Sequence, residues 1–552
     1  MTSSTASSAV SESKARLIEL IKKLVRIPSV TGSPEEVLAA GFIFEQLSQL
    51  DCFKKNPGWL VKIPTPLEGD GRALFTVAAC IMAEKPTPKT VVFIGHYDVV
   101  DASAYGEMRQ AAFDHDKLAE KFANEFIDEG ELIFGRGSMD MKCGVALEME
   151  LLRDYDANRG LFDVNVIALF VPDEENSGCG MRGAAEYLAE LKAELGLAYI
   201  ACIDTEPSEP GMPGAEKQLI FLGSLGKLLP AFYCRGAEAH IGNYYKGLSA
   251  ALLSTHIVQI AEANPGLADP LRSVCYPSWV CLKHRTLEES YSVTVPNRSI
   301  AYFNCLVTTK TPSQVMTEMT EIAEEAATRI VRDMCESHAK LSSLGYKPGI
   351  QKLEVRVLSF ADIFEMAALL FEGGIEALLR YTEDFIMNCT SGDSRDRGVA
   401  LVERLTEIAR IEPPFIATGF LPPYNPPRTS ALVPHVVRAM DRVIEEAKSN
   451  FGVDMEKIEF FSGISDMSFT GFAGTDADVE TYRTNCPCWG TLFTVPFEAM
   501  QEIDIPVVNI GPAGHDAHKR TERLETRYSL DVLPHLLVSA VRALSEEWDA
   551  EH

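Results

Sequence analysis

Four short apolar runs, each followed by acidic residues or histidine, are the feature of this 552-residue chain that most restricts its fold. The runs are residues 91–94, 164–171, 199–203 and 505–510, and segments with helical periodicity separate them. Apolar runs rich in β-branched residues, alternating with helices, are typical of strands buried in a mostly parallel sheet with helices on both faces. Such sheets place their chemistry in the loops at the carboxyl ends of the strands. We therefore expect an α/β fold with a functional site at that edge.

The residues that follow these runs are of the types that bind metal ions. The motifs are Gly95-His96-Tyr97-Asp98, Pro172-Asp173-Glu174-Glu175, Asp204-Thr205-Glu206-Pro207 and Gly511-Pro-Ala-Gly-His515-Asp-Ala-His518, with the loop Gly135-Arg-Gly-Ser-Met-Asp140-Met-Lys-Cys-Gly144 between the first two. Taken singly, each motif also fits an ordinary role, such as a helix cap for Asp140. Together they would bring imidazoles and carboxylates to one edge of the sheet, and that mixture of nitrogen and oxygen ligands suits zinc. Without a metal, so many carboxylates in one cleft would repel one another.

The composition excludes several classes of partner. Lys and Arg number 51 against 79 Asp and Glu, and the formal net charge is -28. Neither a nucleic acid nor an anionic membrane surface would find a cationic face on such a chain. No run approaches the roughly 18 apolar residues of a membrane span. The 13 cysteines are scattered, and the first residues resemble neither a signal peptide nor a transit peptide, so we expect a cytoplasmic protein with reduced thiols.

Two domains are expected from the length of the chain and from a change of pattern in its middle. The expected parts are a disordered tail over 1–13, a catalytic domain formed by 14–226 and 429–552, and an inserted lid or dimerisation domain over 227–428. The insert has the pattern of an α+β domain, with a mainly helical insertion near 359–411. The Pro-rich stretch 422–427 is expected to connect the insert back to the main sheet.

As a set, the motifs resemble the zinc-dependent family of acetylornithine deacetylase, succinyl-diaminopimelate desuccinylase, aminoacylase and glutamate carboxypeptidase. The matching stretches come in the family's order and span nearly the whole chain. They are Ile27-Pro-Ser-Val-Thr-Gly, Gly95-His-Tyr-Asp-Val-Val, Gly135-Arg-Gly-Ser-Met-Asp-Met-Lys-Cys-Gly, Pro172-Asp-Glu-Glu, Glu206-Pro-Ser and Gly511-Pro with Ala517-His518-Lys519. The chain length and Phe461-Ser-Gly-Ile-Ser-Asp-Met-Ser-Phe469 look most like the RocB-type arginine-utilisation branch. The resemblance implies a mostly parallel-sheet zinc-hydrolase domain with an inserted α+β domain.

The resemblance also implies a set of metal ligands. They are His96, Asp140, Glu175, Glu206 and His518, with Asp140 bridging two ions. Asp204 is the rival of Glu206, and His515 is the rival of His518. Relatives have a cis peptide after the bridging aspartate, so the Asp140–Met141 bond is expected to be cis.

Three further residues resemble catalytic groups of the family. Glu174 would be the general base, taking a proton from a water whose pKa the ions lower towards about 7, and then protonating the leaving nitrogen. Asp98 would hydrogen-bond the other nitrogen of His96 and fix its tautomer. His240, within Arg235-Gly-Ala-Glu-Ala-His240-Ile-Gly, resembles the family histidine that reaches the active site, often from the partner subunit, and would donate to the oxyanion. The ordinary alternative for His240 is a hydrogen-bonded surface histidine.

The chain departs from the family where relatives hold the carboxylate of the substrate. Val293, Leu306 and Ser468 occupy positions where succinyl-diaminopimelate desuccinylase and its relatives carry an Asn and two Arg residues. Substrates of those relatives should therefore not be transferred to this chain. Two outcomes are open: a nearby cation such as Arg298 takes over, or the substrate presents no carboxylate there. The ordinary alternative for Arg298 is a solvated surface arginine.

These parts predict zinc-dependent hydrolysis of an amide bond in a small molecule, such as an N-acyl amino acid or a dipeptide. The expected cofactors are two divalent metal ions, zinc or, in its place, cobalt or manganese. One alternative is an aminopeptidase or dipeptidase with the same site. A second is a binding protein that retains the fold without turnover, and the presence of Glu174 beside a full ligand set argues against it. The expected partners are the small amide substrate and a second copy of the chain in a homodimer.

Overall fold

The four apolar runs form neighbouring strands of one eight-stranded mixed sheet. The strands are, in spatial order, β1 (Leu60–Pro64), β2 (Phe75–Ile81), β5 (Asn165–Val171), β3 (Lys89–His96), β6 (Ala198–Asp204), β16 (Val507–Asn509), β7 (Gln218–Phe221) and β15 (Met455–Ile458). Strands β5, β3, β6 and β16 pair in parallel, whereas β1 with β2, β2 with β5, and β16 with β7 are antiparallel. The predicted fold class is therefore confirmed.

The computed structural model describes residues 2–65, 71–122, 124–126, 130–208, 217–272, 274–277, 279–288, 291–351, 354–461 and 463–552. It divides into two units. The first unit contains Met1–Leu225, Arg428–Phe472 and Pro496–His552, and the second contains Gly226–Pro427 and Ala473–Val495. No helix among the described residues is both long and apolar enough to cross a membrane.

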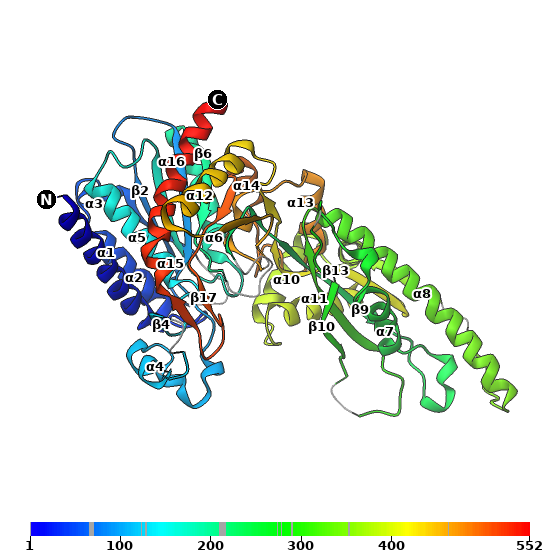
Figure 1. Cartoon of the computed structure of the whole chain (residues 1–552). Helices are drawn as coiled ribbons and strands as arrows, with labels where there is room; N and C mark the ends of the chain where they lie inside the picture. Colours follow the sequence, from blue (N-terminus) through cyan, green and yellow to red (C-terminus); the bar gives the residue numbers. More distant parts are fainter. Residues whose placement is uncertain are drawn as a thin grey trace. The chain divides into compact units, whose positions relative to one another are not determined.

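Helices bury both faces of the eight-stranded sheet in the first unit. The helices are α1 (Thr2–Val25), α2 (Glu35–Leu47), α3 (Asp51–Lys55), α4 (His115–Phe122), α5 (Lys142–Ala157), α6 (Cys179–Leu195), α12 (Pro434–Phe451), α14 (Phe497–Ile503), α15 (Thr526–Asp531) and α16 (Leu533–Glu551). Val91 and Phe93 of β3 join a core shared with α1, α2, α5, α12 and α16, and α12 packs along α16 (Figure 1). Val92 and Ile94 alternate with them and are also buried, while α6 contacts β1, β2 and β5. Burial on both faces explains why these strands have continuous apolar sequences.

Short elements complete the first unit around the carboxyl edge of the sheet. A three-stranded sheet consists of β17 (Gly514–His515), β18 (Arg523–Glu525) and β4 (Leu132–Phe134). Strands β8 (Gly223–Ser224) and β14 (Arg428–Thr429) form a second small pair. The 3-10 helices η1 (Pro57–Trp59), η2 (Ser103–Ala111) and η5 (Asp466–Thr470) lie in loops.

The second unit is built on a five-stranded sheet that is antiparallel except for one pair. Its strands are, in spatial order, β10 (Trp279–Thr286), β11 (Arg298–Val307), β9 (Gly226–Arg235), β13 (Phe415–Asn425) and β12 (Arg356–Ser359). Its helices are α7 (Ala250–Ala261), α8 (Pro312–Ser343), α9 (Phe360–Leu370), α10 (Gly374–Asn388), α11 (Ser394–Ile408) and α13 (Asp476–Asn485), with η3 (Ile241–Lys246) and η4 (Pro265–Leu267) in loops. Helix α8 is the long green helix of Figure 1, and a capping box of Thr311 and Gln314 begins it.

The structure differs from the sequence-based expectation in three segments. Helix α1 begins at Thr2, so it includes residues 2–13, within the range where a tail was expected. Ala and Ser in this segment disfavour a helix less than Gly or Pro would. Residues 422–425 are part of β13, and the prolines fall where its pairing with β9 is interrupted, between Leu421 and Asn425, so no ladder N–H is lost. Residues 473–495 belong to the second unit, because α13 packs against α8, α9 and β13.

Candidate metal centre

The carboxyl ends of three parallel strands bring the predicted motifs to one edge of the sheet. Strand β3 ends at His96, which lies opposite Val171 at the end of β5. Ile94 of β3 lies opposite Asp204, the last residue of β6. The motifs containing Glu174, Glu175 and Glu206 therefore start beside His96, as the parallel arrangement predicts.

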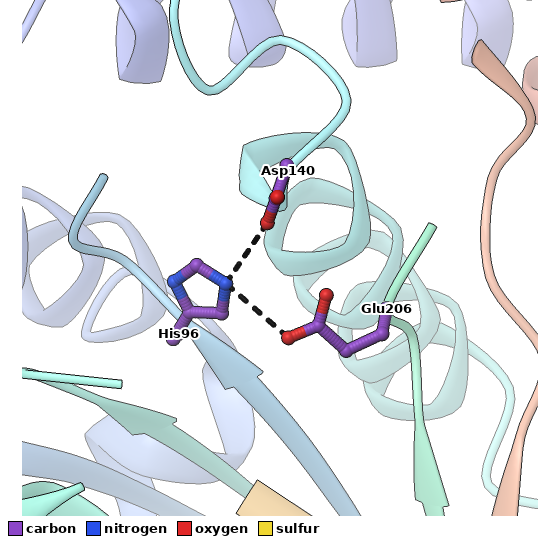
Figure 2. Close-up of side chains that lie close together, drawn as sticks. All are labelled: His96, Asp140 and Glu206. Carbon is purple, nitrogen blue, oxygen red and sulfur yellow. Dashed lines mark hydrogen bonds and ion pairs between the residues drawn. The ribbon is translucent and has the colours of Figure 1, made fainter. Parts of the chain in front are cut away.

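His96, Asp140 and Glu206 form the first group of candidate ligands (Figure 2). The Nε2 atom of His96 lies 3.2 Å from Oδ1 of Asp140 and 3.3 Å from Oε1 of Glu206. The imidazole is buried at the base of the edge, with 1% of its side chain exposed. Figure 2 shows both carboxylates pointing at the same nitrogen, from the loop before α5 and from the end of β6.

Asp140, Glu175 and His518 form the second group. The Nε2 atom of His518 lies 3.0 Å from Oδ2 of Asp140 and 3.1 Å from Oε1 of Glu175. Asp140 thus offers one oxygen to each group, and within each group the ligand atoms lie within 4.8 Å of one another. The side chain of His518 is 50% exposed, so the second group faces the surface of the first unit.

The protonation states in this cluster indicate a place for a cation. Burial raises the pKa of Glu206 to about 8, and burial together with the charge of Asp140 raises the pKa of Glu175. Hydrogen bonds to Asp140 and Glu175 raise the pKa of His518 to about 10. Protons therefore have to hold these carboxylates together when no metal is bound, and divalent ions would replace those protons.

The tautomer of His96 fits a metal ligand. Its Nδ1 atom lies 3.0 Å from the backbone oxygen of Asp98 and can donate a hydrogen bond to it. The Nε2 atom then faces two carboxylate oxygens. Burial alone would lower the pKa of His96, but the surrounding carboxylates raise it well above its usual value, so without a metal Nε2 carries a proton, and a bound ion would take the place of that proton. The motif resemblance predicts the Nδ1 hydrogen bond to the side chain of Asp98, but Oδ1 of that carboxylate lies farther away, at 3.5 Å.

The carboxylate of Asp98 instead holds the loop that carries the two glutamates. It accepts hydrogen bonds from the backbone N–H groups of Glu174 and Glu175, at 3.2 and 3.3 Å, and from the hydroxyl of Thr31 at 2.8 Å. Burial raises the pKa of Glu174 well above its usual value, and nearby carboxylates add to the shift. Glu174 belongs to neither ligand group among the described residues.

The loop before α5 presents Asp140 through a cis peptide. The Asp140–Met141 bond is cis, which confirms the expectation drawn from the resemblance. The helix starts two residues later, at Lys142. The buried amino group of Lys142 donates to the backbone oxygens of Leu24 and Ile27, at 3.0 and 2.6 Å. These bonds hold the start of α5 against the end of α1.

The rival ligands lie outside both groups. Asp204 accepts a hydrogen bond from the hydroxyl of Ser465 at 2.9 Å, and His515 belongs to strand β17. Neither is a member of the two groups found among the described residues.

One buried acidic residue near the centre was missed by the sequence analysis. Asp466, at the start of η5, has a pKa that burial raises well above its usual value, and its Oδ2 atom is buried without a hydrogen-bond partner. Its charge also raises the pKa of Glu174. The signal that could have found it is its place in the 461–469 motif, directly after Ser465.

His240 lies in the second unit, directly before η3, and its side chain is exposed. Its Nδ1 atom accepts a hydrogen bond from the N–H of Gly242 at 3.1 Å, so in the neutral ring Nε2 carries the proton. A backbone bridge joins His240 to Thr294, and the N–H of Ile241 donates to the oxygen of Val293 at 3.1 Å. The predicted donor thus lies beside one of the positions where the chain departs from its relatives.

None of the three positions where the chain departs from its relatives offers a cation. Val293 is 47% exposed, and the side chain of Ser468 is fully buried in the first unit. Leu306 lies on β11. Arg298 donates to Glu403 at 2.8 Å and to the backbone oxygen of Leu287 at 3.3 Å. It is therefore a paired, half-buried arginine and not the solvated surface arginine of the ordinary alternative.

Comparisons with known proteins agree with this geometry and define the class of protein. The chain belongs to peptidase family M20/M25/M40, whose family model matches residues 92–544. It is thereby a metallopeptidase or amidohydrolase, an enzyme that hydrolyses amide bonds. The family resemblance drawn from the motifs is confirmed.

Individual relatives cover nearly the whole chain. It is 30% identical to the uncharacterized protein YqjN of Bacillus subtilis (strain 168) over 97% of both chains. It is 29% identical to protein RocB of the same organism, over 95% of this chain and 94% of RocB. Among solved structures, the dipeptidase Dug1p of Saccharomyces cerevisiae has a similar fold, with a TM-score of 0.53, 13% identity and 97% of each chain covered.

The two ligand groups predict that each imidazole serves one metal ion. The protein as purified should contain about two divalent ions per chain, and His96→Ala and His518→Ala should each weaken the binding of one of them. His515→Ala is the matched control and should leave the content unchanged, because His515 lies outside both groups. Elemental analysis after removal of loosely bound metal measures all three. A fully active protein without metal would contradict the prediction.

Proposed function

We propose that the enzyme hydrolyses an amide bond of a small molecule, which is an N-acyl amino acid, a dipeptide or a related amide, with two divalent metal ions that are zinc. The observation that carries this proposal is the sharing of Asp140 between two ligand groups, His96 with Glu206 and His518 with Glu175. A donor set of two imidazoles and three carboxylates fits zinc, and also cobalt or manganese. When bound, the ions polarise the carbonyl oxygen of the substrate and lower the pKa of a water.

In this proposal Glu174 moves the proton. Its raised pKa suits a group that accepts a proton from the attacking water and returns it to the leaving nitrogen. The nitrogen requires that proton because an amide anion is a very poor leaving group. Asp98 keeps Glu174 and Glu175 in fixed positions through their backbone N–H groups, so that adjacent residues can serve different roles.

His240 is proposed as the donor that stabilises the oxyanion. An exposed ring with the proton on Nε2 supports this role, because that N–H has no need to rearrange before it donates. We also propose that two copies of the chain form a dimer through the second unit. Strand β10 lies at the edge of its sheet and exposes Val280 and Leu282, and such edges pair readily with another strand.

The proposed substrate class depends on the absence of the carboxylate clamp, the Asn and two Arg residues with which relatives hold the carboxylate of the substrate. No charged residue occupies positions 293, 306 and 468, and Arg298 is held by Glu403. We propose that, within this class, the preferred substrate is a related amide that presents no free carboxylate at this position. The resemblance to the RocB-type arginine-utilisation branch makes arginine-derived amides the first compounds to examine.

Removing the proposed base should separate chemistry from metal binding. Glu174→Gln should lower kcat by about 10²–10⁴-fold, the range typical of a general base, while the metal content stays near that of the wild type. Glu175→Gln is the matched neighbour and should lose metal, because Glu175 belongs to a ligand group. Steady-state kinetics and elemental analysis of both variants test the assignment. Loss of metal from Glu174→Gln alone would show that the two roles are exchanged.

Mixed dimers test the role of His240 and the dimer together. His240→Ala should lower kcat by about 10²–10³-fold, as expected for loss of an oxyanion donor, with metal content unchanged. If the histidine acts in the partner's site, mixing inactive His240→Ala with inactive Glu174→Gln should restore activity in the mixed dimers. If it acts in its own chain, mixing should restore none. Unchanged kcat in His240→Ala would remove this residue from the mechanism.

Substrate preference tests the absence of the clamp. N-acetylornithine and N-succinyl-diaminopimelate should be poor substrates, with kcat/KM about 10–100-fold below that of the preferred amide, because a charge-assisted hydrogen bond is missing. The comparison should include dipeptides, amides without a free α-carboxylate and arginine-derived amides. Efficient turnover of either family substrate would show that Val293, Leu306 and Ser468 were misinterpreted.

A further inference from the structure

Arg136 and Glu522 form a fully buried ion pair behind the second ligand group. Their side chains are 1% and 0% exposed, and Nη1 of Arg136 contacts Oε2 of Glu522. The other oxygen of Glu522 accepts a hydrogen bond from the N–H of Gly137 at 2.7 Å. The other terminal nitrogen of Arg136 donates to the backbone oxygen of His518 at 2.9 Å. One guanidinium therefore connects the loop of Asp140 with the loop of His518.

The loop that carries His518 needs such support because its backbone is in an unfavourable conformation. Asp516 and His518 have φ values of 61° and 65°, in the left-handed region that residues with a Cβ rarely adopt. Asp516 is held by hydrogen bonds from Thr521 and Arg523, at 2.8 and 2.6 Å. The hydrogen bond from Arg136 holds the backbone oxygen of His518.

The position of Arg136 is set by its neighbours in the loop before α5. Gly135 and Gly137 have φ values of 138° and 80°, and a Cβ on either would approach Val25 or Val99 within 2.8 or 2.6 Å. The N–H of Gly135 donates to the backbone oxygen of Glu522 at 3.2 Å, which continues the pairing of β4 with β18. The guanidinium is thus held in place on both sides, and it also lies over the ring of Tyr105.

We infer that Arg136 and Glu522 are positioning residues for the second metal ion, acting through His518 without touching the ion. The guanidinium fixes the carbonyl of His518, which orients the imidazole towards Asp140 and Glu175. Glu522 in turn fixes the guanidinium, through its ion pair with Arg136 and its hydrogen bond from the N–H of Gly137. The first group has no such dependence, because His96 is fixed at the end of strand β3. This inference rests on the proposed two-ion centre.

The experiment measures the binding of each ion separately. Arg136→Met keeps most of the side-chain volume and removes both hydrogen bonds of the guanidinium. It should lower the affinity for one of the two ions by about 10–100-fold, the range for loss of a partner that orients a ligand, and leave the affinity for the other ion at the wild-type value. Competition of zinc-loaded protein with a chelator, read by elemental analysis, gives both affinities. Arg136→Lys should show a smaller loss, because its ammonium keeps a positive charge beside Glu522 but cannot bond Glu522 and His518 in the planar geometry of a guanidinium. This variant replaces Arg136→Met in the experiment if Arg136→Met does not fold.

Arg428→Met is the matched control for general destabilisation. Arg428 also joins a carboxylate, that of Asp504 at 2.9 Å, to a backbone oxygen, that of Ile505 at 2.8 Å, but neither residue is a candidate ligand. This variant should lower thermal stability and keep both ions. Wild-type affinity for both ions in the Arg136 variants, or equal weakening of both ions, would overturn the inference. Wild-type protein that binds fewer than two ions would instead contradict the proposed function.

Discussion

The sharing of one carboxylate between two histidines is the interaction on which the functional centre depends. Asp140 presents Oδ1 to His96 and Oδ2 to His518, and two further carboxylates complete the groups. Acidic side chains at this spacing repel one another in a buried setting, so the arrangement is stable only with protons or metal ions among them. Parallel strands and the loop before α5 are what force these charges together, and the fold and the cation requirement are therefore two aspects of one constraint.

The two ligand groups are held by different means. His96 and Glu206 lie at the ends of neighbouring strands, where the hydrogen-bonded sheet and the buried core leave them little freedom. Glu175 and His518 lie on loops, and their positions depend on local contacts, those of Asp98 for Glu175 and of Arg136 for His518. The half-exposed His518 marks the side of the centre that is open at the surface of the first unit. The first group is therefore buried and held by the sheet, whereas the second group is accessible from solvent and held by side-chain contacts.

The candidate metal ligands all lie in one unit, whereas the residues proposed for the oxyanion and for recognition are divided between the two units. The ligands and Glu174 belong to the first unit, whereas His240 and Val293 belong to the second. The backbone contacts between the His240 turn and the segment around Val293 mean that a change in one alters the other. Substrate preference can therefore change in the inserted unit while the metal ligands stay the same, which is consistent with a chain that keeps the hydrolytic residues of its family and lacks the clamp.

The sequence alone determined the parallel sheet and the edge at which the site lies, because strand ends, motif order and residue chemistry are local properties, and the resemblance of the motifs named the candidate ligands. The choice of Glu206 over its rival Asp204 rested on the resemblance of the motif and not on any physical difference visible in the sequence. The two are separated by one residue at the same strand end, and a partner 261 positions away, Ser465, occupies Asp204. The sequence could not reveal that Glu403 pairs with Arg298 or that Arg136 holds His518, since these contacts join residues 105 and 382 positions apart. Periodicity and motifs carry no information on such pairs. The tertiary structure decides them, because only packing brings a buried charge to its partner.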